Sequence, residues 1–519
     1  MNAVELSLFA HRLNAICDEM GAVLRRTALS PNIKDREDYS CALFDADGEL
    51  VAQAAHIPVH LGSMAYCMRD VVGRMDWREG DVVVFNDPFL GGTHLPDITL
   101  VAPLFLAGRL IGFSATRAHH ADVGGATAGS MGIHDRLSDE GVVIPPVHWW
   151  REGREERDSL GDFLARVLSG DERLADLSAQ RAACLCGARR LLELNDVIPC
   201  HDGFAELLAA SESYGRQAVA DIPDGEYRFA DVLEDDGMGA VDLPIAVSIR
   251  IAGDAARVDF SGSAPQCSGP VNCPLSVTAA AVFYVFRCLM PAHTPQTSAI
   301  FRCIGLAAPA GCIVNASPGA AVAAGNVETS QRIVDVVLGA LSQALPERIP
   351  AAAQGTMNNV IFADASRQPA WVYYETLAGG MGAHAGGDGL SAVQCHMTNT
   401  RNTSIEVLEM HYPLRITEYA VRRGSGGAGR HHGGDGLCRE WQAVAACQVS
   451  LLGERRRTAP YGLQGGAQGM SGRHSLIRGC ETIELPAKLT VQLQPGERLR
   501  IETPGGGGFG KLSDENPER

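Results

Sequence analysis

The chain has 519 residues, of which 46% are hydrophobic and 20% charged, so it is a globular protein long enough for one large core or several. Its formal net charge of −17 (44 Lys and Arg against 61 Asp and Glu) argues against a nucleic-acid partner, because nucleic acid requires a basic face. The 15 cysteines include no CxxC pair, so we expect buried thiols in a reducing compartment and no disulfide framework.

The N-terminal region predicts a helix over residues 3–28 and no targeting signal. Charged residues at Glu5, Arg12, Asp18 and Glu19 interrupt any apolar core of a signal peptide. The longest apolar run, residues 275–286, is shorter than the roughly 20 residues that cross a bilayer. We therefore expect a cytoplasmic protein with no membrane partner.

Residues 39–53 predict a hairpin, with strands at 39–44 and 49–53 around the turn DADG. A helical segment then ends near Met75, and the β-branched run DVVVF at 81–85 predicts a buried strand. A second hairpin is expected from residues 98–105 and 110–116. His94 and Asp97 precede this hairpin, and His119, His120 and Asp122 follow it, so antiparallel pairing would bring Asp97 and His119 to the same end.

The rest of the chain predicts helices and strands in mixed order. Helices are expected at 159–195, 203–219, 274–289 and 327–345, short strands at 225–261, and β-hairpins at 440–501. In the first of these helices the predicted buried face consists of Leu174, Leu177, Leu185, Ala188 and Leu192. The order predicts an α+β fold in one domain, residues 1–512, which could divide into lobes at 1–150, 151–330 and 331–512. TPGGGGFG at 503–510 predicts a close-packed turn or a flexible tail, and residues 513–519 a frayed end.

The His/Asp clusters suggest a metal site, because imidazole and carboxylate are ligands of borderline divalent metals. In a strand, His119 and His120 would point to opposite faces, so only one of them would be a direct ligand. The alternative is that these residues satisfy buried backbone groups in loops. His56 and His60 are more consistent with structural histidines.

Other motifs indicate a function less clearly. The phosphate-binding pattern GxxxxGK[ST] and the nucleophile elbow GxSxG are both absent. GNVETSQR carries Asn326, Glu328, Ser330 and Arg332 before an apolar helix. Asn326 could cap that helix, or the polar group could contact a substrate or another subunit.

Several passages together resemble the B-type component of the hydantoinase/oxoprolinase family. They are DREDYSCALFD, HIPVHLGSM, NDPFLGGTHLPDITLVAP, HHADVGG, EGVVIPP, GNVETSQRIVDVVLGAL, MTNTRNTSIEVLE and TPGGGGFG. The resemblance implies a hetero-oligomer with an A-type ATPase subunit, which binds ATP and phosphorylates an amide or enolate oxygen. It also implies a divalent metal (zinc or manganese, or iron) held by Asp38, His94, Asp97 and His119.

The resemblance implies ATP-dependent opening of a small cyclic amide such as a hydantoin, oxoproline or lactam. Water activated at the metal would attack the phosphorylated amide, with His120 or Asp122 as general base or as a partner that orients a ligand histidine. One alternative is a subunit of an acetone- or acetophenone-type carboxylase. A second is a non-catalytic scaffold for the ATPase subunit.

Overall fold

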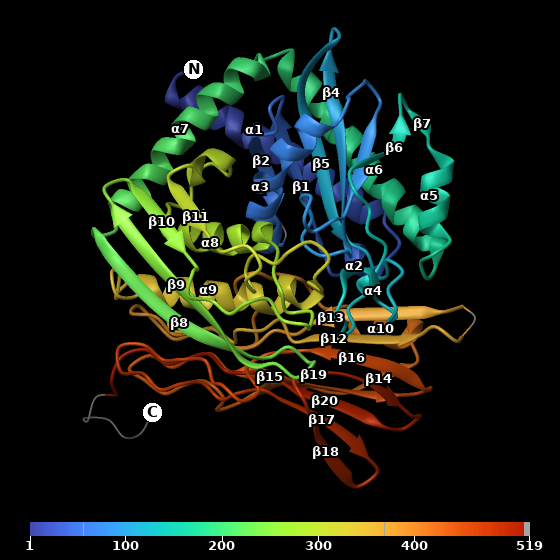
Figure 1. Ribbon diagram of the computed structural model, residues 1–519, viewed down its shortest axis with the longest axis vertical. Helices are drawn as coiled ribbons and strands as arrows, with labels where there is room; N and C mark the ends of the chain where they lie inside the picture. The colour runs from blue at the N-terminus through green and yellow to red at the C-terminus, as the bar shows by residue number, and fades with distance from the viewer. Residues whose placement is uncertain (56, 368, 513–519) are drawn as a thin grey trace.

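A computed structural model describes residues 1–55, 57–367 and 369–512. Helices and strands alternate irregularly along the chain, and the strands form four sheets, which confirms the α+β prediction. In Figure 1 the N-terminal sheet stands in the upper part, two C-terminal sheets lie below, and α8 and α9 lie between them. His56 and the predicted frayed end at 513–519 lie outside the described residues.

The first sheet is antiparallel throughout and has the order β2-β1-β5-β4-β3-β6-β7. Its strands are β1 (Tyr39–Asp45), β2 (Leu50–Ala55), β3 (Val82–Phe85), β4 (Asp97–Leu106), β5 (Arg109–His119), β6 (Val147–Arg151) and β7 (Arg154–Glu155). Both predicted hairpins are present. The structure adds that β4 begins at Asp97 and β5 ends at His119, so candidate ligands occupy the ends of the two central strands.

Helices cover both faces of this sheet, which explains why β1 is buried along nearly all its length. Cys41 and Leu43 face the core made with α1 (Ala3–Thr27), α6 (Gly170–Asn195) and α7 (Cys200–Ala220). Ala42 and Phe44 face the core made with α3 (Pro58–Arg74). This two-residue alternation fixes which side chains each layer receives.

The predicted helix at 159–195 is two helices, because the chain breaks between α5 (Arg157–Leu164) and α6. Ser169 adopts a left-handed conformation with φ 53° just before α6 begins. The predicted buried face is also wrong at Leu185, which is 41% exposed. Leu177 is buried as predicted, and Cys184 and Leu191 are buried with it, at the seven-residue spacing that keeps side chains on one helix face.

The second sheet, β11-β10-β9-β8, packs on the two central helices (Figure 1). Its elements and these helices are β8 (Gly225–Asp235), β9 (Val241–Ala252), β10 (Ala255–Asp259), β11 (Ile304–Ala307), α8 (Leu275–Leu289) and α9 (Ser330–Leu341). Every residue of α9 is buried. The hydrophobic core around these helices includes residues from Ile57 to Leu452, so distant parts of the chain share one core. The division into three lobes stays a prediction.

The C-terminal part is a sandwich of two sheets with a shared core that includes Phe362, Trp441, Leu451 and Ile501. The sheets have the orders β13-β12-β16-β19 and β14-β15-β20-β17-β18. Their strands are β12 (Asn359–Asp364), β13 (Trp371–Thr376), β14 (Leu414–Arg422), β15 (Gly436–Ala443), β16 (Cys447–Leu452), β17 (Arg473–Arg478), β18 (Glu481–Leu485), β19 (Lys488–Leu493) and β20 (Arg498–Glu502). The remaining short elements are α2 (Pro31–Lys34), α4 (Leu137–Glu140), the 3₁₀ turn Ser298–Phe301, the π-helical turn Gly325–Thr329 and α10 (Ile405–His411). No described helix is long and apolar enough to span a membrane.

TPGGGGFG is a close-packed segment, so the prediction of a flexible tail is wrong. Gly506 donates a backbone hydrogen bond to Gly434 O (2.9 Å) and accepts one from Gly427 N (2.8 Å). Its neighbours come so close that a Cβ on Gly506 would lie 2.1 Å from Met381 O. Only glycine allows backbone segments to pack at this distance.

Gly506→Ala should therefore destabilise the protein by about 1–3 kcal/mol, because the added methyl group meets backbone that cannot move aside. Gly161→Ala is the matched control, since Gly161 is exposed in α5 with no atom within 4 Å of its Cβ position. It should gain roughly 0.5–1 kcal/mol from helix propensity. Chemical denaturation of both variants measures the difference, and equal stabilities would contradict the packing described here.

Candidate metal centre

Three candidate ligands meet at one end of the first sheet. Asp97 and His119 are direct cross-strand partners in the β4–β5 register. His94 lies in the turn before β4, where Asp97 N donates to His94 O (3.1 Å). One ligand atom from each of these residues lies within 4.8 Å of the other two, and all three side chains are buried. The prediction that hairpin pairing brings Asp97 and His119 together is confirmed.

Imidazole nitrogens of both histidines lie close to the same carboxylate oxygen of Asp97. His94 Nε2 lies 3.1 Å and His119 Nδ1 3.3 Å from Asp97 Oδ1. Burial opposes the charge on Asp97, but His94 and the hydrogen bonds of the surrounding histidines outweigh it and hold its pKa well below the usual value. Burial lowers the pKa of His119, whereas at His94 the neighbouring Asp97 overcomes burial and raises the pKa. Asp97 is therefore an anion that the cluster keeps charged.

The other oxygen of Asp97 is held by Thr93 of the same turn and by groups from two further segments. Thr93 Oγ1 donates to Oδ2 at 2.6 Å, His60 Nε2 lies 3.4 Å away, and Asn326 Nδ2 donates at 3.5 Å. His60 also contacts Ser40 Oγ (3.0 Å). The sequence analysis favoured a structural role for His60 and could not place it here, because it comes from α3 on another layer.

The donor set fits a divalent ion. His94 Nδ1 lies 3.4 Å from the carbonyl oxygen of Ala323, which can only accept, so Nδ1 carries the proton. His94 Nε2 then bears a lone pair directed into the cluster. Although it lies 3.1 Å from Asp97 Oδ1, it makes no hydrogen bond of good geometry with any described residue. The cavity between the ligands has a volume of about 20 Å³, enough for one ion or water and no more. Nitrogen and carboxylate donors of this kind suit zinc, manganese or iron.

Asp38 lines the same small cavity without joining the three-residue group. Its backbone oxygen accepts from His119 N (3.0 Å), which fixes it at the start of β1. Its carboxylate lies 3.7 Å from the Arg36 guanidinium, which in turn lies over the Tyr374 ring at 4.3 Å. Asp38 as a fourth ligand therefore stays a proposal.

His120 and Asp122 point to other parts of the fold. His120 Nε2 contacts Gln180 Oε1 of α6 at 2.9 Å, as expected for the strand face opposite His119. Asp122 accepts backbone N–H groups of Gly124, Gly129 and Leu168 and so holds the following loop together. Neither residue lines the small cavity, so a role for either as general base stays a prediction.

The GNVETSQR motif is an internal network. Asn326 does not cap a helix; it is buried in the π-helical turn and faces Asp97. Glu328 accepts from Asn359 Nδ2 (2.8 Å), and Tyr374 OH donates to Asn359 Oδ1 (2.8 Å). The Tyr374 ring stacks on His119 with 4.8 Å between centroids. The prediction that this motif contacts another subunit is also wrong, because Glu328, Ser330 and Arg332 are fully buried. A π-helical turn is common at functional sites, but the sequence gives no signal for it.

Residues 2–512 match the model of the hydantoinase B/oxoprolinase family. The chain is 39% identical to 5-oxoprolinase 1 of Arabidopsis thaliana over 98% of its own length but only 42% of that protein, so it spans less than half of such relatives. It is 32% identical to a Pseudomonas protein assigned as the B component of a D-/L-hydantoinase, over 98% of this chain and 90% of that one.

Two solved structures have the same fold as this chain. The ATP-dependent caprolactamase of Pseudomonas jessenii superposes with a TM-score of 0.92 at 28% identity, covering 98% of this chain and 91% of that chain. An acetone carboxylase superposes with a TM-score of 0.88 at 19% identity, covering 99% of this chain and 77% of that chain, a likeness that concerns the fold alone.

Asp97→Asn should reduce the metal content of the purified protein to background, because it removes the anion on which both histidines converge. Asp122→Asn is the matched control: a buried carboxylate at the same end of the sheet that lies outside the cluster. It should keep its metal. Elemental analysis after metal loading measures the content, and an Asp97→Asn protein with full occupancy would refute the site.

A separate prediction concerns pH. Burial raises the pKa of Glu328 to about 8 from an ordinary value of 4.5. Between these values the folded protein keeps a proton that the unfolded chain has lost, so the free energy of unfolding falls as pH rises. Glu328→Gln removes this penalty, and its stability relative to the parent should increase from pH 4.5 to about 8.

Denaturant unfolding at several pH values tests this expectation. Glu481→Gln, at an exposed position on β18, is the control and should show no such trend. A stability difference between Glu328→Gln and the parent that does not change with pH would contradict the buried, protonated carboxyl.

Proposed function

Because the chain belongs to the hydantoinase B/oxoprolinase family, we propose that it is the metal-bearing B-type component of an ATP-dependent amidohydrolase that opens a cyclic amide. A hydantoin, an oxoproline or a lactam would be the substrate. The observation that carries this proposal is the buried group of His94, Asp97 and His119 with the unpartnered Nε2 of His94.

His94, Asp97 and His119 would hold the ion, with Asp38 as the fourth ligand. When bound there, a divalent ion supplies Lewis acidity toward water and toward the substrate oxygen. His60, Thr93 and Asn326 fix the orientation of the Asp97 carboxylate, as outer partners of metal ligands generally do. Tyr374 fixes the ring plane of His119 by stacking.

Substrate would approach through a surface cavity of about 440 Å³ that shares Thr400 with the small cavity. Arg36 lies next to Thr400. Its guanidinium is 3.4 Å from Thr400 Oγ1 and 3.5 Å from Thr376 Oγ1. Its Nε has no hydrogen-bond partner among the described residues. Arg36 would attract a phosphorylated, anionic substrate toward the metal centre.

The reaction needs ATP, which an A-type partner subunit would bind. Transfer of the γ-phosphoryl group to the amide oxygen makes the ring carbon electrophilic. Water adds to that carbon, and the C–N bond breaks as its electron pair and a proton go to nitrogen. A further water releases phosphate from the acyl phosphate, leaving the ring-opened acid. The side chains of this chain position the substrate and exclude bulk water during these steps.

The proposal is tested by co-expressing the chain with an A-type ATPase subunit of the same family and measuring ATP-dependent turnover. We expect ring opening of a hydantoin, oxoproline or caprolactam, with at least a hundredfold loss in the Asp97→Asn complex, on the order seen when metal-centre partners are lost. Bicarbonate-dependent consumption of a ketone would instead identify a carboxylase. A complex in which Asp97→Asn leaves turnover unchanged would indicate a scaffold.

A further inference from the structure

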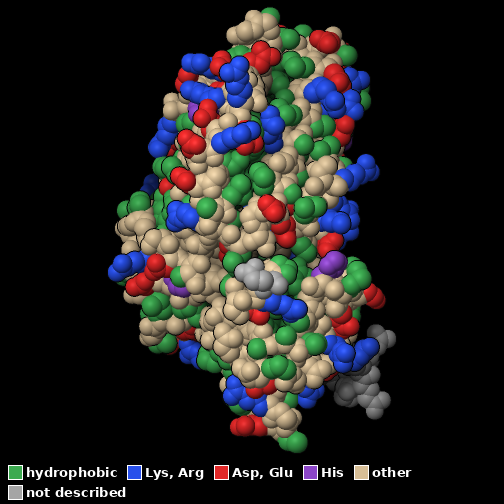
Figure 2. All heavy atoms as spheres, turned by 90° about the vertical axis from the view of Figure 1, so that its right-hand side faces the viewer, with side chains coloured by type: hydrophobic (Ala, Val, Ile, Leu, Met, Phe, Trp, Pro, Cys, Tyr) green, Lys and Arg blue, Asp and Glu red, His purple; other side chains and the backbone are tan. Residues whose placement is uncertain are grey.

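A second cavity, separate from the metal centre, carries an excess of positive charge. Its volume is about 770 Å³, and it lies between β8, the segment after Glu454 and residues 468–473. No residue lines both this cleft and the cavity at His94. Five arginines but only two carboxylates line it, in a chain whose net charge is −17. Figure 2, by contrast, shows acidic and basic side chains interspersed over one face of the molecule. Cavities of this size accept small-molecule ligands.

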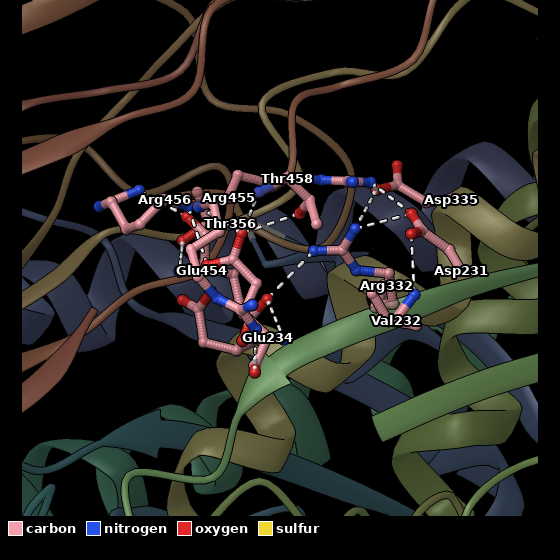
Figure 3. Close-up of polar contacts among 12 residues, drawn as sticks. Asp231, Val232, Glu234, Arg332, Asp335, Thr356, Glu454, Arg455, Arg456 and Thr458 are labelled. Atoms are coloured by element: carbon pink, nitrogen blue, oxygen red, sulfur yellow. Dashed lines mark hydrogen bonds and ion pairs between the residues drawn. The ribbon is translucent and has the colours of Figure 1, made fainter. Parts of the chain in front are cut away.

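Two of the five arginines are neutralised by short ion pairs within the protein, and a third, Arg422, has Glu502 at 3.6 Å. Arg455 lies 2.8 Å from Asp231 and 2.6 Å from Asp335, and Arg457 lies 2.9 Å from Asp242. Asp231 also pairs with the buried Arg332 at 2.7 Å. Figure 3 shows Arg332 and Arg455 reaching Asp231 and Asp335, while Arg456 lies on the other side of the view. Asp231 is thus already shared by two cations and leaves the other arginines of the cleft without its charge.

Arg456 is held rigidly by neutral groups. It donates to Asn358 Oδ1 (2.7 Å), to the Glu454 carbonyl and to His474 Nε2, 3.1 Å from its own Nε. His474 Nδ1 lies 3.1 Å from the Pro486 carbonyl oxygen, so its Nε2 is the acceptor. No carboxylate lies within ion-pair distance of Arg456 in the described part of the chain. Burial lowers the pKa of Arg456 to about 10, which still leaves it charged at neutral pH.

Arg422 and Arg473 complete the basic wall. Arg422 is fixed by the carbonyl oxygens of Ser471 (2.8 Å) and Thr503 (3.1 Å), and Glu502 is 3.6 Å away. Arg473 is exposed at the start of β17. Phe229 and Tyr461 also line the cleft, and they form an aromatic pair with 5.3 Å between ring centroids.

We propose that this cleft binds a phosphate group, free or carried by a nucleotide, through Arg422, Arg456 and Arg473. Guanidinium groups match the geometry of phosphate oxygens and bind them through charge-assisted hydrogen bonds. Phosphate would supply the direct ion-pair partner that the Arg456 guanidinium lacks among the described residues. The aromatic pair offers a nucleotide base a surface on which to stack. The site goes beyond the proposed function, because it requires neither the metal nor the partner subunit.

Isothermal titration of the purified full-length chain in phosphate-free buffer tests the proposal, first with inorganic phosphate and then with ADP. We expect saturable binding that weakens at least about tenfold in Arg473→Gln and in Arg456→Lys, since each loses charge-assisted hydrogen bonds. Arg478→Gln is the matched control, because Arg478 lies at the other end of β17, pairs with Glu497 and does not line the cleft. Melting temperatures confirm that each variant is folded.

The two probes distinguish the two sources. ADP binding more tightly than phosphate, with Phe229→Ala weakening ADP alone, supports a nucleotide site. Equal affinities for both probes support a site for free phosphate. Failure of both probes to bind saturably, or equal weakening by Arg478→Gln and Arg473→Gln, overturns the proposal. Asp97→Asn should bind phosphate as the parent does, so failure of the metal centre and failure of this cleft are separate results.

Discussion

The cross-strand pairing of Asp97 with His119 is the constraint on which the rest of the site depends. Asp97 begins one central strand and His119 ends the next, in a sheet that is covered on both faces, so neither strand can slip by one residue without moving its apolar side chains to the wrong layer. The register therefore fixes the carboxylate against the imidazole. His94, three residues before Asp97 in the preceding turn, then meets the same oxygen.

The site draws on the whole length of the chain. The N-terminal sheet supplies the three grouped ligands, α3 supplies His60, the π-helical turn supplies Asn326 and β13 supplies Tyr374. A buried, unpaired carboxylate would cost several kcal/mol, roughly the size of a domain's net stability. The surrounding donors offset that cost, and they are available only when the central helices and the C-terminal sandwich are in place.

Part of this arrangement could be predicted from the sequence. Hairpin spacing and strand periodicity place Asp97 and His119 together, and ligand chemistry identifies them with His94. Residues that reach the site from other layers could not be found in this way, because no local pattern records which distant segment packs where. His60, Asn326 and Tyr374 are of this kind. The exposed Leu185 and the buried glycine tail show the same limit, since tertiary packing decided both.

We propose that His94, Asp97 and His119 hold one divalent ion. Anomalous diffraction from a crystal of the metal-loaded protein, recorded at the absorption edge of the metal found, tests it most directly. The account predicts a single strong peak about 2.0–2.2 Å from His94 Nε2, a His119 nitrogen and an Asp97 oxygen. A loaded crystal with its peak elsewhere, or with none at this cluster, would contradict it.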